Sequence, residues 1–214
     1  MALDTFSDLQ ASVQSWAVRK DTKFNAEFPN FVFLAERRIY HGGDTVTPSD
    51  PLRAKVQDVR TTLDFADGEA ELPDDVLDVR KLHRETDKNG LNYIDPQEFE
   101  ELDAAFQAGG SPRVYTVEGS TVRLAPTFTG TLRLGYWKEF PPITETAPTH
   151  DLLKAHPEVW FEGILYHAFS WMQMAQLAQA HFSLFKAAIE GANRTRRAIQ
   201  QPTQLRMRPA RRII

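Results

Sequence analysis

Apolar residues recur at helical spacing near both ends of the chain, and they alternate with polar residues in its middle. Residues 4–19 place apolar side chains every three or four positions, which predicts a first helix. Residues 29–40 repeat this spacing and stop before Gly42, so they predict a second helix. The composition of residues 42–51 is that of a loop.

The longest stretch of helical spacing covers residues 150–190 and carries a wide apolar stripe. Pro157 disfavours helical conformation at the residue before it, so we predict a short helix followed by a long one. Because each of these helices has an apolar face to bury, the helices from the two ends of the chain are expected to pack together.

The middle of the chain has the period-two alternation and the frequent turn residues of short strands. The predicted strands cover residues 56–65, 76–83, 91–94, 114–117, 122–125 and 131–137. The fold class predicted is α+β, with N- and C-terminal helices packed as a bundle around an inserted small antiparallel β domain. The expected parts are N-terminal helices at 1–54, a β-rich insert with one short helix at 55–140, C-terminal helices at 141–190 and a basic arm at 191–214.

The run DKNGLNYIDPQEFEEL, residues 87–102, has two interpretations, and one of them is a calcium-binding loop. With Asp87 at the first position, Asn89, Asp95 and Glu98 fall at ligand positions 3, 9 and 12 of an EF-hand. Position 5 lacks a side-chain oxygen and position 6 lacks the glycine of the sharp turn. Those two positions hold Leu91 and Asn92.

The other interpretation of the same run is a β-hairpin followed by a helix. Residues 76–83 form the first strand, the Asn-Gly pair forms the turn, and residues 91–94 form the return strand. Asp95 then caps a short helix over residues 96–106. This interpretation accounts for every residue of the run, including the two that break the calcium motif.

Composition excludes several classes of protein. The chain has 214 residues, of which 42% are hydrophobic, and this suits one compact domain or two small ones. No apolar run approaches the roughly 20 residues of a membrane helix, and the start MALDTFSDLQ has no basic region of a secretory signal. The absence of cysteine excludes disulfides and cysteine-based zinc sites, and it is compatible with a reducing compartment.

The net charge of −4 conceals an asymmetry along the chain. No acidic residue follows Glu190, whereas the rest of the chain has 18 basic and 29 acidic residues. An acidic body with a basic tail is typical of an arm that docks on a partner, although a solvated tail is the alternative. The seven arginines of this candidate docking arm are Arg194, Arg196, Arg197, Arg206, Arg208, Arg211 and Arg212.

No motif indicates catalysis, a cofactor or a metal site. His167 and His181 lie too far apart on one helix to share a metal ion. Glu158 and Glu162 are four residues apart; they fit a solvated helix face, or else the two acids of a cell-wall-degrading enzyme. The sequence contains no G-x-S-x-G turn, no Walker loop and no G-x-G-x-x-G. We therefore predict a protein that is not an enzyme and that needs no cofactor.

Five segments occur along the chain in this order: FPNFVFLAERRIY, ELPDDVLDVRKL, LNYIDPQEFEEL, SPRVYTVEGSTVRLAP, and LRLGYWKEFPPIT followed by THDLLKAHPEVWFEGILYHA. Their order resembles that of the phage head–tail adaptor family of short-tailed phages, the tail tubular protein A-like connectors. In the first segment, Leu34, Ala35, Glu36, Arg38 and Ile39 are similar to the L-A-E-x-R-I core of the family's second helix. In the second, Val76 stands where the family has an aromatic residue.

The resemblance implies a structural protein of the virion neck, made in the host cytoplasm. Such adaptors form a ring, of about twelve subunits, under the portal protein, where they extend the DNA channel and give the tail tube or nozzle protein a platform. The expected partners are therefore the portal protein, the tail tube or nozzle protein and other copies of this chain, with no membrane. Genomic DNA is expected to pass through the lumen without sequence-specific binding, because an acidic lumen repels it. The arginine arm is expected to reach the portal.

Overall fold

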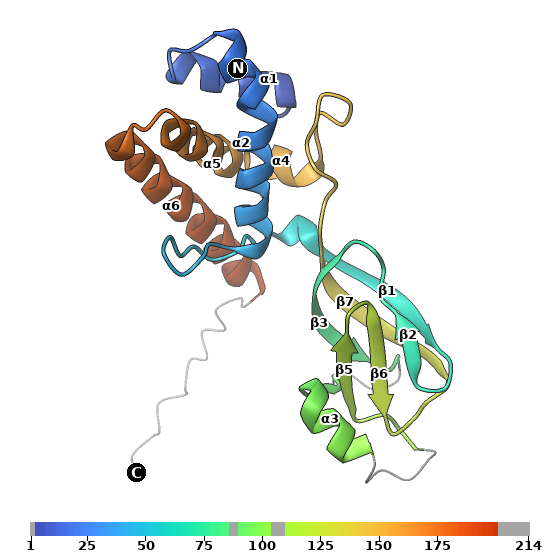
Figure 1. The fold of residues 1–214 in the computed structure, drawn as a ribbon. Coiled ribbons are helices and arrows are strands. Elements are labelled where there is room, and N and C mark those ends of the chain that lie inside the picture. The colour runs from blue at the N-terminus through green and yellow to red at the C-terminus, as the bar shows by residue number, and fades with distance from the viewer. Residues whose placement is uncertain (1–2, 86–89, 104–109, 201–214) are drawn as a thin grey trace, which may run out of the picture. The chain divides into compact units, whose positions relative to one another are not determined.

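The computed structural model of the chain describes residues 3–85, 90–103 and 110–200. The chain divides into two compact units, and Figure 1 shows their elements. The helical unit comprises residues 1–55, 143–149 and 153–214, and the β unit comprises residues 56–142 and 150–152. The fold class is α+β, as the sequence predicts. Among the described residues, no helix combines the length and the apolar character that crossing a bilayer requires.

The helical unit begins with α1 (Phe6–Trp16) and α2 (Thr22–His41). Thr5 caps α1 by accepting a hydrogen bond from the backbone N–H of Asp8. The predicted start of the second helix at residue 29 is wrong, because α2 begins seven residues earlier, after its cap Asp21. Pro29 lies inside α2 with its side chain exposed, and the buried aromatic residues on the helical turns before it hold those turns to the core.

Three helices follow the strands in the chain: α4 (Asp151–Ala155), whose first two residues belong to the β unit, α5 (Pro157–Trp171) and α6 (Ala175–Gln200). The predicted break before Pro157 is confirmed, but the single long helix predicted after it is wrong. Gln173 N donates to Ser170 O (3.0 Å) and Met174 N to Phe169 O (2.9 Å), which ends α5 in a Schellman motif. Gln173 takes the left-handed conformation, φ 60°, that glycine usually supplies, so the sequence carries no signal for this break.

Helix α5 lies at the centre of the helical unit. It packs against α1, α2 and α6, and its side chains are buried almost all the way round. A Cβ atom on Gly163 would lie 3.2 Å from Ala35 Cβ of α2 and 3.1 Å from the Phe185 ring of α6. The missing side chain at Gly163 therefore allows three helices to meet at one point.

The β unit contains two sheets. Sheet A is antiparallel, with the order β1 (Asp58–Phe65), β7 (Gly130–Lys138) and β3 (Val76–His83). A short 3₁₀ turn, η1 (Lys55–Gln57), precedes β1. Sheet B has the order β2 (Glu69–Glu71), β6 (Thr121–Ala125), β5 (Val114–Glu118) and β4 (Asn92–Tyr93).

The predicted hairpin between residues 76–83 and 91–94 is wrong. Residues 76–83 do form β3, but their strand partner is β7, and β4 pairs in parallel with β5 of the other sheet. One hydrogen bond, from Leu91 N to Leu82 O (2.7 Å), joins the two segments before the chain crosses between sheets. The half-buried Leu91 packs into the core between the sheets, which explains the crossing.

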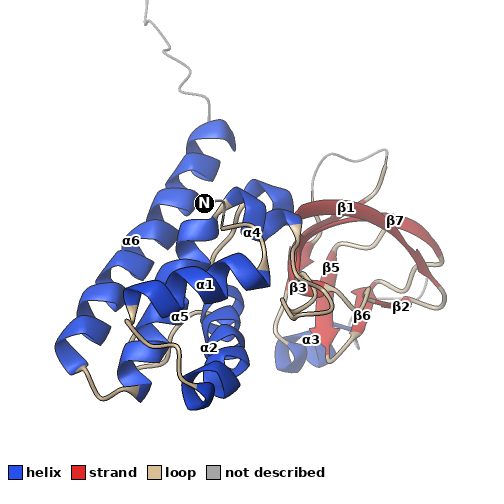
Figure 2. Cartoon of the chain, turned by 90° about the horizontal axis from the view of Figure 1, so that it is seen from above, coloured by secondary structure: helices blue, strands red, loops and turns tan. Residues whose placement is uncertain are grey.

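The β unit has three layers: sheet A, sheet B and α3 (Pro96–Asp103). Leu132, Leu134 and Tyr136 of β7 point into one core that also contains Tyr115 of β5. Strand residues alternate between faces, so Val114 of β5 points the other way, where it joins a second small cluster with Phe99 of α3. Helix α3 therefore covers the face of sheet B that is turned away from sheet A, as Figure 2 shows.

Candidate functional site

The first candidate site is the arginine-rich end of the chain. Arg194 lies on α6 with its side chain 79% exposed, and it forms an ion pair with Glu190 (3.4 Å) one turn earlier. Arg196 is half-buried on the same helix. Arg197 also belongs to α6, but its side chain and the whole of Arg206, Arg208, Arg211 and Arg212 lie outside the described residues.

The last part of α6 is fixed to the loop that follows α2. Asn193 Oδ1 accepts a hydrogen bond from Arg53 N (2.8 Å), and Asn193 Nδ2 donates to Pro51 O (3.0 Å). Leu52 N in turn donates to Ile39 O (2.8 Å) at the end of α2. Because these bonds hold the helix at residue 193, the arginine segment starts from a defined position on the helical unit. The sequence carries no signal that Asn193 joins α6 to this loop, because an asparagine is common in a polar helical stretch.

Helix α6 carries an exposed apolar stripe on the face opposite its buried one. Leu177 is 46% exposed and Leu184 is 51% exposed, whereas Phe185 and Ile189 on the other face are buried. The exposed positions repeat with alternating steps of three and four, the spacing at which one helix packs along another. The α6 stripe comprises Leu177, Ala180, Leu184, Ala187 and Gly191.

A second exposed apolar surface lies on α2. Phe33 is 55% exposed and Leu34 is 43% exposed, and the exposed Pro29 precedes them by one turn. We call these three residues the α2 patch. Leu34 also lines a hollow of about 320 Å³ with Arg37 and other residues. The helical unit thus offers two different apolar surfaces to a partner.

Several residues of the L-A-E-x-R-I segment of α2 make contacts that stabilise the helical unit. Ala35 fits against Gly163, and the buried Glu36 accepts a hydrogen bond at Oε1 from Ile143 N (2.9 Å). Arg38 donates to Thr47 O (3.1 Å) and Thr47 Oγ1 (2.8 Å), and its guanidinium lies over two aromatic rings. The residues that carry the family resemblance therefore fix the position of α2 and of the loop after it.

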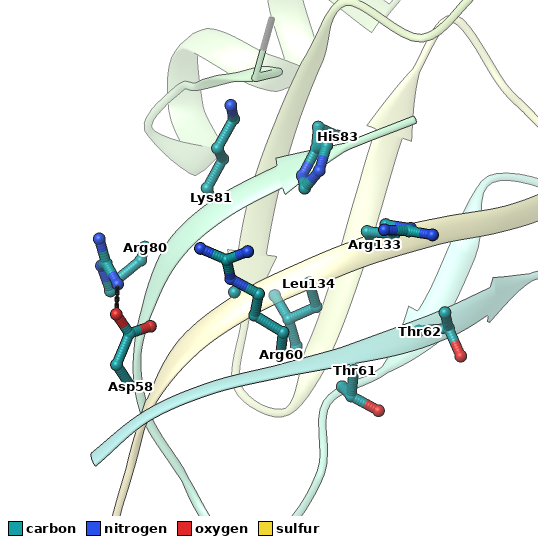
Figure 3. Close-up of a pocket in the computed structure, with 10 residues that line it drawn as sticks. Asp58, Arg60, Thr61, Thr62, Arg80, Lys81, His83, Arg133 and Leu134 are labelled. Atoms are coloured by element: carbon teal, nitrogen blue, oxygen red, sulfur yellow. Dashed lines mark ion pairs between the residues drawn. The ribbon is translucent and has the colours of Figure 1, made fainter. Parts of the chain in front are cut away.

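The outer face of sheet A holds a basic hollow of about 450 Å³ (Figure 3). Gly135 of β7 pairs with Arg60 of β1 on one side and with Lys81 of β3 on the other. Since Gly135 has no side chain, the two cationic side chains flank bare backbone. A register shift between Val79 and Lys81 adds a residue to β3, and such a bulge can turn adjacent side chains toward one face.

Four cationic side chains and His83 line this basic hollow: Arg60, Arg80, Lys81 and Arg133. Arg80 forms an ion pair with Asp58 and lies 4.8 Å from the ring centroid of Trp137. Arg133 forms an ion pair with Glu85. Arg60 forms no ion pair with any carboxylate of the described residues, so its charge can meet a ligand from outside the unit.

The opposite side of the β unit is acidic. Glu98 and Glu101 are exposed on α3, while Glu100 binds Arg123 of β6 (2.6 Å). Glu118 also binds Arg123 (3.1 Å), and these hydrogen bonds raise the pKa of the arginine. The two outward carboxylates, at Glu98 and Glu101, have no such partner among the described residues.

The calcium interpretation involves residues on both sides of a gap in the description. Thr86 to Asn89, and therefore the first and third ligand positions, lie outside the described residues. Asp95 Oδ1 accepts a hydrogen bond from Gln97 N (3.0 Å), which is the capping role predicted for it. Within the part of the chain that is described, no three acidic, histidine or cysteine side chains gather as metal ligands would.

The two glutamates considered as catalytic acids each contact a histidine. His156 Nδ1 lies 3.4 Å from a Glu158 carboxylate oxygen, and this contact holds the pKa of Glu158 below its usual value. His181 Nδ1 lies 2.7 Å from Glu162 Oε2, and the His181 ring stacks on Phe169. Neither carboxylate lines one of the hollows described above.

Comparison with known proteins gives one match that covers almost the whole chain. The sequence model of the family described as SU10 adaptor protein matches residues 4–212. No curated protein matches the chain. The matched range contains both apolar surfaces of the helical unit, both charged faces of the β unit and all seven arginines.

Proposed function

We propose that this chain, which belongs to the SU10 adaptor protein family and so is a phage structural adaptor, joins head to tail as a homo-oligomeric ring. The ring has about twelve subunits, lies under the portal protein and continues its DNA channel. It also gives the tail tube or nozzle protein a surface to attach to.

The observation that carries this proposal is the α6 stripe. A helix of a monomeric unit normally exposes polar residues on its outer face, yet here Leu177 and Leu184 stand out with small residues between them at helix-packing spacing. Burying one such leucine fully is worth about 1.5–3 kcal/mol. The stripe is therefore suited to contact a helix of another subunit.

A closed ring needs two different surfaces on each subunit, because every subunit meets its two neighbours through different faces. The α2 patch supplies the second surface, with Phe33 as its largest exposed side chain. We infer that the α6 stripe of one subunit packs on the α2 patch of the next.

The arginine-rich end of the chain is the proposed portal contact. Asn193 holds α6 in place just before it, and the arginines then carry seven positive charges with no acidic residue among them. The rest of the chain has 18 basic and 29 acidic residues, which supports a lumen that repels DNA and lets it slide. DNA is thus a passing partner rather than a bound one.

The ring is tested by mixing this protein with the portal protein of the same phage and measuring the mass by light scattering behind a sizing column. A complex of portal plus ring, formed from a small free protein, supports the proposal. Separate elution at physiological salt and high concentration contradicts it.

The α6 stripe is tested with Leu177→Glu combined with Leu184→Glu. Two buried charges in a subunit contact should abolish the ring while the free protein keeps its helical content by circular dichroism. Val46→Glu is the matched control, because Val46 is an exposed apolar residue in the loop after α2. Rings formed equally well by the stripe variant would overturn this assignment.

The arginine end is tested by changing its arginines, other than the half-buried Arg196, to glutamine, which keeps the side chains long and polar. The variant should lose portal binding without losing thermal stability. A truncation before residue 194 is a poorer test, because it removes the last turns of α6.

A further inference from the structure

The basic hollow stands in a unit that is otherwise strongly acidic. Residues 56–142 include 17 acidic and 9 basic residues, and four of the nine basic ones line this hollow. Gly135 leaves its floor bare, and the bulge in β3 brings Arg80 and Lys81 to the same hollow. A positively charged hollow on an otherwise negatively charged unit is suited to bind an acidic surface.

The acidic surface of α3 lies on the other side of the same unit. Leu134 and Tyr115 fill the core between the sheets, so the hollow faces outward from sheet A. Helix α3 lies on the outer face of sheet B (Figure 2). Phe99 is buried against that face, whereas Glu98 and Glu101 are exposed. Each β unit therefore has one positive and one negative face, pointing in opposite directions.

We propose that the basic hollow of one copy receives the α3 carboxylates Glu98 and Glu101 of the neighbouring copy. This inference rests on the ring of the proposed function, since a heterologous contact joins two different faces of identical subunits. The contact would set the register of the β units around the ring, while the apolar surfaces of the helical units supply most of the buried area.

The spacing of the charged groups suits such a contact. Arg60 and Lys81 lie on either side of β7, two strand spacings or about 10 Å apart at the backbone. Glu98 and Glu101 are three residues apart on one helix, with Cβ atoms about 5–6 Å apart. The long basic side chains can therefore reach both carboxylates at once.

A nucleic acid is the less favoured occupant. A DNA strand in the hollow would also run along the acidic surroundings of the β unit, which repel phosphate. Asp58 and Glu85 already neutralise two of the four cations. A short acidic helix needs only a local excess of positive charge, such as that of Arg60, whereas a DNA backbone presents a continuous row of phosphates.

The test uses charge reversal in each face and in both faces together. Arg60→Glu with Lys81→Glu, or Glu98→Lys with Glu101→Lys, should raise the concentration needed for half-maximal ring assembly on the portal by at least about tenfold. The variant with all four changes restores opposite charges and should return assembly to within about threefold of the starting protein. Glu101→Lys alone leaves the first turn of α3 intact and should raise the concentration needed for half-maximal assembly by less than the double change does.

Matched controls reverse equal numbers of charges elsewhere. Arg113→Glu with Lys154→Glu controls for the basic changes, and Glu71→Lys with Glu145→Lys for the acidic ones; all four residues are exposed, and none has an ion pair among the described residues. If the control pairs impair assembly as strongly as the test pairs, net charge rather than this contact matters, and the proposal is wrong.

A cross-link then reports the contact directly. Because the chain has no cysteine, Thr62→Cys in the hollow and Gln97→Cys on α3 can be introduced without background. In assembled rings, oxidation of the double variant should give a ladder of covalent multimers, whereas each single variant can give at most a dimer.

The outcomes separate this inference from the proposed function. Rings that form normally but give no ladder and tolerate the reversals overturn the hollow contact and leave the adaptor ring intact. Reversals that spare the ring but abolish binding of a short DNA duplex would make the hollow a nucleic-acid surface, which also overturns the contact. Failure of the unchanged protein to form any ring with its portal overturns both proposals.

Discussion

The helical unit and the β unit bury and expose their residues in opposite ways. The helical unit packs around α5, whose Gly163 contacts α2 and α6 at a single closely packed point. The outer faces of this unit include exposed leucines. The β unit has two separate small cores, one between its sheets and one under α3. Its outer faces are charged, positive on sheet A and negative on α3.

The difference suggests a division of labour in assembly. Apolar faces supply binding free energy that depends little on salt, whereas exposed charges supply orientation that weakens as salt screens them. A ring held by both kinds of contact would keep its subunits together at high salt but lose the register of its β units. The two units should also differ in how a core substitution affects their stability. The helical unit depends on the single contact point at Gly163, whereas the β unit depends on two independent clusters.

The largest effect is expected at the contact point of the helical unit. Gly163→Leu should destabilise this unit by at least about 3 kcal/mol, because the new side chain would overlap the fully buried Phe185 and Ala35. Chemical denaturation followed by circular dichroism measures it. Ser170→Leu, at an exposed position of α5, is the control and should change stability by less than about 0.5 kcal/mol. A Gly163→Leu protein as stable as this control would refute the single-point description.

The second effect concerns the smaller core of the β unit. Phe99→Ala should cost about 3 kcal/mol locally, because Phe99 is the buried residue that attaches α3 to sheet B. Hydrogen exchange should then speed up in residues 96–101 while the β7 amides stay protected. If β7 loses protection to the same extent, the two clusters unfold as one and the β unit resembles the helical unit after all.

The third effect is a loss of stability in acid, which both units should share. Burial lowers the pKa of His167 in the helical unit and of His150 in the β unit to about 4 in each case. The unfolded chain binds these protons near pH 6.5, so stability is full above that pH and falls as the pH drops toward 4. Each histidine should contribute a loss of about 2 kcal/mol by pH 4.

Thermal melting at pH 7 and pH 4.5 measures this loss. His167→Gln and His150→Gln should each reduce the difference between the two pH values, and the double variant should reduce it most. An unchanged difference in the double variant would mean that other groups cause the acid sensitivity.

The sequence predicted local structure well where a single pattern decides it. The strand at residues 76–83 and the two faces of β7, with Arg133 and Gly135 opposite Leu132 and Leu134, follow from alternation alone. The end of α5 could not be predicted, because Gln173 takes a conformation for which its type gives no signal.

The candidate surfaces depended on tertiary structure. Periodicity places Phe185 and Ile189 on the apolar stripe, and both are buried, but it does not show that α6 also exposes Leu177 and Leu184 on another face. The basic hollow needs β7 to lie between β1 and β3, so that Gly135 separates Arg60 from Lys81. Strand order is a long-range property, and no local pattern around these residues states it.

The smallest effect tests the apolar face itself, at Gly191. A Cβ atom there would have no neighbour within 4 Å, so Gly191→Ala should stabilise the free protein by about 0.5–1 kcal/mol through its better helix propensity. The same methyl group would lie on the α6 stripe. If a helix of the next subunit packs closely against Gly191, it leaves no space for this methyl group. We therefore expect opposite signs in two measurements: a higher melting temperature for the free protein and weaker ring assembly on the portal. If the variant has both a higher melting temperature and stronger ring assembly, the subunit contact lies elsewhere on α6, at Leu177 and Leu184 rather than near the end of the helix.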